Sequence, residues 1–275
     1  MAFNEKLILL TNDDGINSPG LRAAAEALSA LAQVTLVAPR EQSTGAGRSM
    51  PANSVGIIHI HQHQINGDPW EVYAVEGTPA QAVQHGLLEL VPRLPDLVVS
   101  GINYGENVGT GVTISGTVGA ALEAASFGIP ALAVSLETPK QFHFSHSVEI
   151  DFSVAAHFTR VFAHLLLTTS PQPDVDVLKV DIPTNATLKT PWRMTHQSRQ
   201  RYYLPVKPQR AQFSDPAKVD YNREILAGLE PDSDVAVLMN EKSVSVTPLS
   251  LDLTSRIDLK AWERELRQGG LEARA

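Results

Sequence analysis

The feature that most constrains the fold of this chain is a short apolar run near its start that ends on two carboxylates. The segment Leu7–Thr11 has the composition of a buried strand in an α/β sheet, and Asn12-Asp13-Asp14-Gly15 follows it directly. Ligands of open α/β sheets lie at the carboxyl ends of the strands, so the Asp pair stands where a ligand is expected. The same run also fits a plain turn that caps the next helix. The choice between a ligand site and a plain turn depends on other segments of the chain.

Strands and helices alternate along the chain up to Pro183, which predicts a parallel, doubly wound sheet. Strand-like runs are expected at residues 34–38, 96–100, 131–135 and 175–182, and helices at 19–31, 79–91, 118–127 and 148–167. Residues 57–63 and 70–75 alternate with the period of a strand and predict a hairpin. We therefore expect residues 1–183 to form one α/β core.

The composition changes after Pro183. Residues 184–235 are rich in Pro, Arg and Gln and lose the alternation of strands and helices, which indicates an extended hairpin or arm that could pack on another subunit. A short strand at 244–249 and a closing helix at 258–268 are expected to follow, with the helix packed on the core. Residues 184–275 are thus predicted to form an arm, a returning strand and a closing helix that belong to the same domain.

The overall composition argues against several classes of protein. A net charge of −8 does not suit an electrostatic binder of nucleic acid polymers. The sequence contains no cysteine, so it offers neither disulfides nor thiolate metal ligands. No run is long enough to span a membrane, and the start of the chain lacks the pattern of a signal peptide. A cytoplasmic protein that binds no membrane is therefore expected.

Two further loops follow predicted strands and carry oxygen ligands. One contains Ser43 and Thr44, and the other contains Asn103. Together with Asp13 and Asp14 they would supply carboxylate, hydroxyl and amide oxygens, which suit Mg²⁺, Mn²⁺ or Ca²⁺ better than zinc. The sequence therefore predicts a divalent cation at the ends of three strands, with positions left open for water and substrate.

Three histidines are a second, weaker candidate for a metal site. His59, His61 and His63 alternate along one predicted strand and so share a face, which could hold zinc. A solvated face is the simpler interpretation, because no carboxylate is placed to orient the rings.

The run Ser115-Gly116-Thr117 begins a predicted helix beyond the Asn103 loop. Backbone N–H groups at a helix N-terminus bind anions, although Ser115 would serve equally well as an ordinary cap. A cation held by oxygen ligands beside such a helix end is the arrangement that hydrolysis of a phosphate ester requires. The glycine patterns of dinucleotide-binding, NTPase and α/β-hydrolase sites are absent from the sequence.

Several runs of the sequence, taken in order, form a wider pattern. They are Thr11-Asn12-Asp13-Asp14-Gly15, Ser18-Pro19-Gly20, Val37-Ala38-Pro39, Gly77-Thr78-Pro79-Ala80, Ser100-Gly101-Ile102-Asn103, Ser115-Gly116-Thr117-Val118, Pro130–Ser135, Gln197-Ser198-Arg199 and Val244–Leu249. This set covers nearly the whole chain and resembles the SurE family of stationary-phase survival proteins, which are metal-dependent nucleotidases.

The resemblance implies a three-layer, Rossmann-like α/β core with a mostly parallel sheet, and a C-terminal arm exchanged between the subunits of a homodimer or homotetramer. It implies release of phosphate from nucleoside 5′-monophosphates, with some members also acting on 3′-monophosphates or short polyphosphate. One divalent ion per subunit is expected, Mg²⁺ or Mn²⁺, with Ca²⁺ able to take its place in a crystal.

The resemblance also assigns roles to particular positions. The expected metal ligands are Asp13, Asp14, Asn103 and a hydroxyl at Thr44 or Ser43, and the expected catalytic residues are Asp13, Asp14 and Asn103. The expected substrate contacts are Asn12, Gly15, Ser115, Gly116 and Thr117. The ungapped register favours Thr44, whereas a shift of one residue restores the serine that is usual in the family.

Four departures from the family pattern leave the substrate preference open. Ile114 stands where an aromatic residue or histidine is common, and Gly111 replaces an acidic residue. Gln81-Ala82 replaces Asp-Cys, and Ser243 replaces an aromatic residue. None of them touches the predicted metal site.

The sequence thus predicts a phosphomonoesterase in which a metal-activated water attacks the phosphorus. Attack by Asp13 itself, giving an aspartyl phosphate, is the mechanistic alternative. A non-catalytic nucleotide-binding regulator on the same scaffold is the alternative from another class of protein. The Asp pair argues against it, because buried carboxylates are costly without a cation.

Overall fold

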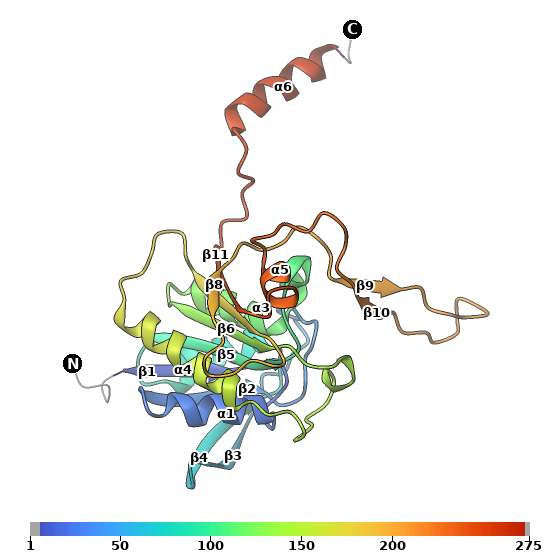
Figure 1. Ribbon diagram of the computed structural model, residues 1–275. Helices are drawn as coiled ribbons and strands as arrows, with labels where there is room; N and C mark the ends of the chain where they lie inside the picture. The colour runs from blue at the N-terminus through green and yellow to red at the C-terminus, as the bar shows by residue number, and fades with distance from the viewer. Residues whose placement is uncertain (1–5, 273–275) are drawn as a thin grey trace.

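The computed structural model describes residues 6–272, and these residues are built on one large sheet (Figure 1). From one edge to the other, its nine strands are β3 (Ile58–Ile65), β4 (Asp68–Val75), β2 (Gln33–Pro39), β1 (Leu7–Thr11), β5 (Leu97–Tyr104), β6 (Ala131–Leu136), β7 (Val177–Ile182), β11 (Val244–Leu249) and β8 (Trp192–Met194). Neighbours run parallel from β4 to β7, while the pairs β3–β4 and β7–β11 are antiparallel. The prediction of an α/β protein with a mostly parallel sheet is confirmed.

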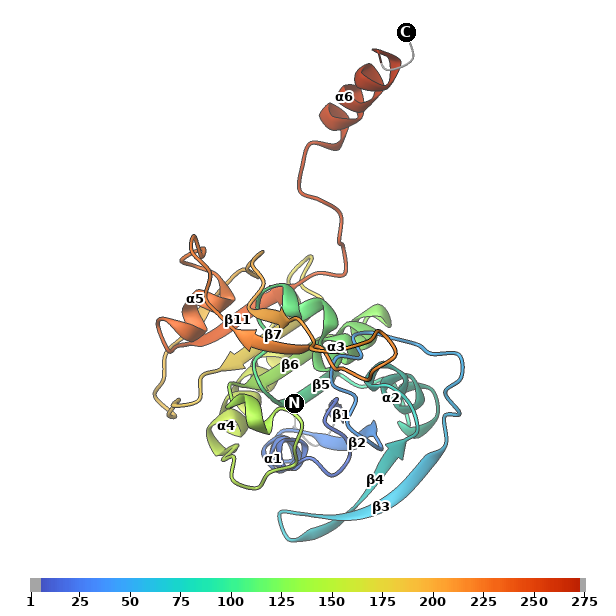
Figure 2. The same ribbon diagram turned by 90° about the vertical axis from the view of Figure 1, so that its right-hand side faces the viewer.

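Helices cover both faces of this sheet and complete three layers (Figures 1 and 2). One face carries α1 (Pro19–Leu28) and α4 (Ser153–Thr168), and the other carries α2 (Pro79–His85) and α3 (Gly116–Ser126). Ile8 and Leu10 of β1 belong to the first core and Leu9 to the second, as the alternation of a strand requires. None of the helices within residues 6–272 is long and apolar enough to cross a membrane.

The strand order brings three loops together at one edge of the sheet. In the order β2-β1-β5, the strands that follow β1 lie on opposite sides of it, so the carboxyl end of β1 is a topological switch point. Ligands of open α/β sheets bind at such a point. The Asp13–Asp14 pair follows β1, the loop with Thr44 follows β2, and Asn103 lies near the end of β5. The three groups of predicted oxygen ligands therefore converge.

Every predicted helix differs somewhat in its bounds from the structure, and two of the differences concern the helices expected at 148–167 and 79–91. The helix expected at 148–167 begins later, at Ser153, because the carboxylate of Asp151 accepts its backbone N–H at 2.8 Å and starts the first turn there. The helix expected at 79–91 changes into a π-helical turn over Gly86–Leu90. These changes alter the ends of elements and leave their order intact.

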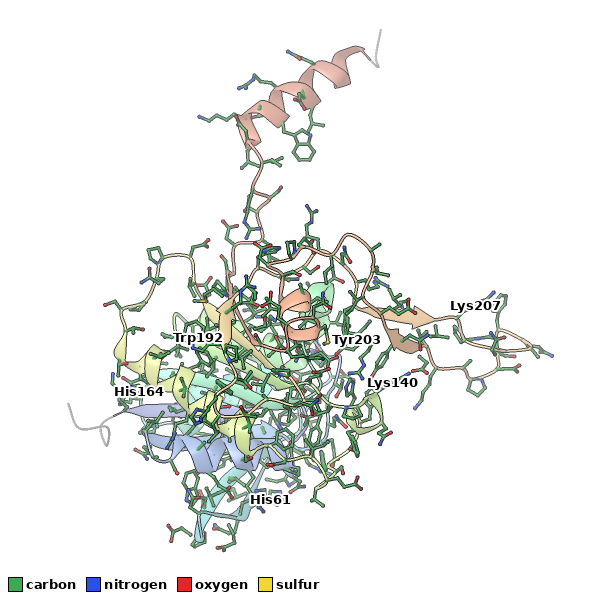
Figure 3. All side chains as sticks on the ribbon, viewed as in Figure 1. His61, Lys140, His164, Trp192, Tyr203 and Lys207 are labelled. Carbon is green, nitrogen blue, oxygen red and sulfur yellow. The ribbon has the colours of Figure 1, made fainter. Side chains whose placement is uncertain are left out.

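The segment after β7 forms the predicted hairpin together with elements that return to the body. Strands β9 (Tyr203–Val206) and β10 (Asp220–Arg223) pair antiparallel and project outward. Figure 3 shows Tyr203 where the hairpin meets the body and Lys207 farther out along it. Strand β8 and the short helix α5 (Asp234–Met239) pack back beside β11, so only part of the segment is an arm.

The closing helix, α6 (Leu259–Glu272), differs from the prediction that it packs on the core. An extended segment at residues 250–258 carries it away from the body (Figures 1 and 2). Its apolar side chains Leu259, Trp262 and Leu266 are 54%, 50% and 58% exposed. They form only a narrow stripe on an otherwise polar helix, and the single chain leaves that stripe uncovered.

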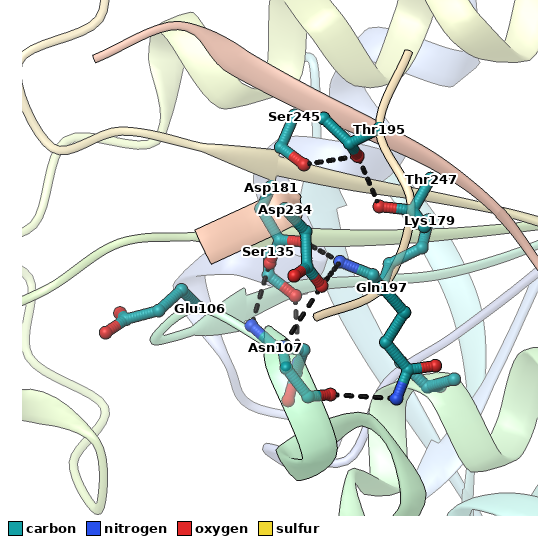
Figure 4. A network of polar contacts seen from close by, with 12 residues as sticks. Glu106, Asn107, Ser135, Lys179, Asp181, Thr195, Gln197, Asp234, Ser245 and Thr247 are labelled. Carbon is teal, nitrogen blue, oxygen red and sulfur yellow. Dashed lines mark hydrogen bonds and ion pairs between the residues drawn. The ribbon is translucent and has the colours of Figure 1, made fainter. Parts of the chain in front are cut away.

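A buried ionic cluster ties the sheet to the C-terminal segment (Figure 4). Lys179 Nζ on β7 lies 2.5 Å from Asp181 Oδ2 and 3.3 Å from Asp234 Oδ2, and all three side chains are fully buried. Asp181 accepts the backbone N–H of Asn107 at 2.7 Å, and Asp234 accepts that of Gly109 at 3.1 Å. The cluster therefore fixes the loop that follows β5.

Replacing the cation of this cluster should be strongly destabilising. Lys179→Met leaves two buried carboxylates without their partner, and we expect the free energy of unfolding to fall by about 3–5 kcal/mol. Denaturation in urea measures the change. Lys207→Met, at an exposed position on the hairpin, should change it by less than about 0.5 kcal/mol. Equal effects at the two positions would contradict the role of the cluster.

Candidate active site

Asp13 and Asp14 lie at the end of β1 with almost no exposure to solvent. Asp13 is 2% exposed and Asp14 is 0% exposed. The turn that follows is closed by Asn12, whose side-chain amide donates to the carbonyl of Gly15 and accepts its N–H. Gly15 has a φ of +96°, which favours glycine. Asn12 and Gly15 thus shape the turn. Neither of them lines the cavity that lies beside Asp13.

The N-terminus of α3 is directed at Asp13. The hydroxyl of Thr117 donates to Asp13 Oδ1 at 2.5 Å, and the backbone N–H groups of Gly116 and Thr117 bond to the same side chain. A Cβ on Gly116 would lie 2.7 Å from that of Asp13, so this close approach requires glycine. Two of the three residues expected to hold phosphate therefore contact Asp13. The third, Ser115, accepts the N–H of Val118 and lines the cavity.

Asp14 is held by partners from two other loops. The backbone N–H of Tyr104 donates to its Oδ2 at 3.1 Å. The side-chain amide of Gln42 lies 2.9 Å from Asp14 Oδ1 and also 2.9 Å from Thr44 Oγ1. Gln42 thus connects a carboxylate to the hydroxyl predicted as a metal ligand. This role of Gln42 was not predicted, because a glutamine in a polar loop carries no signal of its own in the sequence.

The electrostatics of the pair favour a bound cation. Burial raises the pKa of Asp13 to about 6, although the Thr117 hydroxyl counteracts part of this rise. Burial and the neighbouring Asp13 charge raise the pKa of Asp14 well above its usual range. No cationic side chain within residues 6–272 is among the principal causes that shift either pKa. A divalent cation would supply the missing positive charge.

The remaining predicted ligands reach the same place from their own loops. Asn103 and Thr44 line the cavity together with Asp13. The side-chain amide nitrogen of Asn103 donates to a backbone carbonyl at 2.6 Å, so its oxygen is the atom suited to a metal. Ser43 does not line the cavity, and its hydroxyl donates to a backbone carbonyl at 3.4 Å. The cavity therefore brings together a carboxylate, an amide and a threonine hydroxyl that fit a hard cation, while the adjacent carboxylate of Asp14 does not line it.

The histidines considered for zinc lie elsewhere, on the edge strand β3. His59 Nε2 is 2.8 Å from a carboxylate oxygen of Glu76. Throughout the described part of the chain, no group of three or more His, Cys, Asp or Glu side chains is arranged to hold a metal. A metal at the Asp pair must consequently draw on amide and hydroxyl oxygens as well.

A cavity of about 480 Å³ opens beside Asp13. One side is formed by the strand-end residues described above. The opposite side comes from the loop with His143 and Phe144 and from the hairpin with Tyr203 and Tyr221. Neither segment was predicted to contribute to the site, because no local pattern in the sequence shows that it reaches the strand ends.

Fold and site together define a class: a three-layer α/β protein with a buried carboxylate pair beside a cavity at the carboxyl ends of its parallel strands. The chain belongs to the SurE family, because the family model described as Survival protein SurE matches residues 8–204. The resemblance seen in the motifs is thereby confirmed.

Individual relatives agree with this assignment. A protein named 5′-nucleotidase SurE from Methanothrix thermoacetophila is 39% identical over 259 residues, which cover 91% of this chain and 95% of the relative. One of the same name from Thermococcus gammatolerans is 40% identical, covering 94% and 95%. The crystal structure of a SurE protein from Aquifex aeolicus superposes with a TM-score of 0.70 at 31% identity, covering 93% of this chain and 97% of that one.

The pKa of Asp13 predicts how a cation stabilises the protein at different pH. Without a cation, the folded-state pKa of about 6 exceeds the ordinary value of 3.8, so the folded state loses stability as the pH rises through 6. A cation relieves this loss where Asp13 is ionised. Mn²⁺ should therefore raise the Tm more at about pH 7.5 than at about pH 5. Calorimetry measures both values.

Asp13→Asn is the control for this measurement, because it removes the titrating group. Its Tm should respond less to Mn²⁺ and with a smaller dependence on pH. An equal rise in Tm at both pH values in the unaltered protein would contradict the prediction.

Proposed function

We propose that this protein is a metal-dependent phosphomonoesterase that hydrolyses nucleoside 5′-monophosphates to nucleoside and phosphate. The chain is an enzyme of the nucleotidase class, since relatives 36–40% identical over more than nine tenths of it carry the name 5′-nucleotidase SurE. The observation that carries the finer proposal is the buried Asp13–Asp14 pair beside a cavity large enough for a nucleotide.

The strand-end oxygens form the proposed cation site. Asp13, Asp14, Asn103 and Thr44 would hold the ion, and Ser43 is less suited because it does not line the cavity. Mg²⁺ and Mn²⁺ are the proposed ions, as both prefer oxygen ligands. When bound, such an ion polarises a phosphoryl oxygen and lowers the pKa of a water molecule.

The chain's own residues orient the reacting groups. Thr117 fixes the carboxylate of Asp13 through its hydroxyl, and Tyr104 fixes that of Asp14 through its backbone N–H. Ser115 presents its hydroxyl at the cavity, where the phosphate would lie. The turn formed by Asn12 and Gly15 before α1 would contribute by keeping the two carboxylates close together. Hydrolysis of 3′-monophosphates and short polyphosphate belongs to the same proposal, because those substrates present the same terminal phosphoryl group.

Phosphate release from a panel of nucleoside monophosphates tests the proposal. Release should require Mn²⁺ or Mg²⁺ and stop with a chelator. In Asp13→Asn, kcat should fall by about 10²–10³-fold, the size typical of losing one electrostatic contact to a transition state. Thr44→Val should also lower the rate, whereas Ser43→Ala should not. Asp68→Asn, at an exposed turn, is the matched control and should leave the rate unchanged.

Two outcomes would replace this mechanism. Nucleotide binding without a divalent ion and without turnover would identify a non-catalytic regulator. A phosphorylated Asp13 trapped during a single turnover would identify attack by the carboxylate, whereas label from oxygen-labelled water in the first phosphate released, with no phosphorylated enzyme formed, would support direct attack by water.

Assembly into a homodimer or homotetramer is part of the same proposal. Two exposed apolar features support it: the stripe on α6 and Phe213, which is 98% exposed in the hairpin. Light scattering should give the mass of two or four chains. Removal of residues 250–275 should lower the number of chains per assembly. A monomer in both the full-length and the shortened protein would contradict the assembly.

A further inference from the structure

The cavity has two halves of different chemistry. The half beside β1 carries a carboxylate, an amide and a hydroxyl, from Asp13, Asn103 and Ser115. The other half carries the apolar and aromatic side chains of the cavity, from Ile114, Phe144, Tyr203, Pro205, Val219 and Tyr221, and the charged residues Arg201 and Asp220 also line the cavity. Because both halves belong to one cavity, a ligand with a charged end and a flat apolar end fits it.

Contacts with the body hold the hairpin side of the apolar half in place. The hydroxyl of Tyr203 donates to the backbone carbonyl of Glu106 at 2.6 Å. The guanidinium of Arg223 donates to the buried carboxylate of Glu106 at 3.0 Å, and Lys140 Nζ lies 2.6 Å from Asp220. Tyr203 and Lys140 stand at the base of the hairpin in Figure 3. This wall of the cavity is therefore held in place by contacts within the protein itself.

The polar atoms of the two tyrosines are already engaged. Besides the contact of Tyr203, the hydroxyl of Tyr221 donates to His143 Nδ1 at 2.8 Å, and His143 Nε2 donates to the carbonyl of Thr138 at 3.1 Å. Burial lowers the pKa of His143 to about 4, so this chain of hydrogen bonds keeps a neutral imidazole. The tyrosines thus contribute ring surface to the cavity rather than free hydroxyls.

Large apolar side chains remain exposed at the rim. Ile114, Phe144 and Val219 are 60%, 65% and 65% exposed, and all three line the cavity. Exposed apolar groups gathered at a cavity indicate a surface that a ligand covers. Gly111 contributes to the shape, because a Cβ there would lie 3.3 Å from the Tyr203 ring. Two departures from the family pattern, Ile114 and Gly111, therefore fall in this half.

We propose that Ile114 and Phe144 are specificity-determining residues that hold the nucleobase of the substrate by stacking and apolar contact. The inference rests on the proposed nucleotidase function and adds to it the way in which the base is recognised. Because contact area carries this recognition, substrates rank by the size of the flat base. A purine nucleotide is preferred to a pyrimidine nucleotide, and both are preferred to a sugar phosphate without a base.

Ribose 5-phosphate separates base recognition from the reaction. It has the phosphate and sugar of a nucleoside 5′-monophosphate and lacks the base. In the unaltered protein, kcat/KM for adenosine 5′-monophosphate should exceed that for ribose 5-phosphate by about 10–100-fold, the size measured for stacking of one base. Phe144→Ala and Ile114→Ala should each lower this ratio severalfold, mainly through a higher KM for the nucleotide.

Leu88→Ala is the matched control, because this leucine is 73% exposed, lies in the π-helical turn after α2 and does not line the cavity. It should leave the rates with both compounds unchanged. Binding of adenosine, which carries no phosphate, gives a readout apart from turnover. Calorimetry should detect it in the unaltered protein and in Leu88→Ala, and should show weaker binding in Phe144→Ala. Since Ile114 and Phe144 are largely exposed, both variants should keep the Tm of the parent protein.

The outcomes distinguish this inference from the function on which it rests. If the protein hydrolyses neither compound, the proposed function fails. If it hydrolyses both at equal kcat/KM, or if the ratio and the binding of adenosine are unchanged in Phe144→Ala and Ile114→Ala, the base-binding role is overturned while the phosphatase stands.

Discussion

The structure around the active site depends on one constraint, the burial of two adjacent carboxylates at the end of a strand. Burial raises the pKa of both carboxyl groups, the charge of Asp13 raises that of Asp14 further, and a bound cation or a proton relieves this. The surroundings are arranged accordingly. A glycine turn stops β1 after Asp14, the N-terminus of α3 bonds Asp13, and Gly116 allows the helix to approach.

Much of this arrangement can be predicted from the sequence because it is encoded locally. The apolar run of β1, the acidic pair and the Ser115-Gly116-Thr117 helix start are each recognisable within a few residues, and the order of the elements fixes which strand ends meet. The sequence did not reveal that Gly116 and Thr117 turn toward Asp13. A helix N-terminus attracts a carboxylate of the protein as readily as a phosphate, and only the packing of α3 decides between them.

The parts that sequence reasoning missed depend on contacts between distant segments. Arg223 and Glu106 form their ion pair across the chain, and this pair brings the hairpin to the cavity. The buried position of Lys179 in an apolar strand is explained only by its ion pairs with Asp181 and Asp234. For α6 the sequence shows an amphipathic helix, but amphipathicity does not specify which surface covers the apolar stripe, and the body of the same chain does not.

The division of the cavity between the sheet and the hairpin has a consequence for how such a protein changes over time. The strand ends cannot vary without disturbing the core, because their side chains are buried against it. The hairpin and the rim loops lie outside the sheet, and their exposed side chains contribute little to folding. A lineage can therefore change the shape of one wall, and with it the range of molecules that the cavity admits, while the strand ends that carry the carboxylates stay as they are.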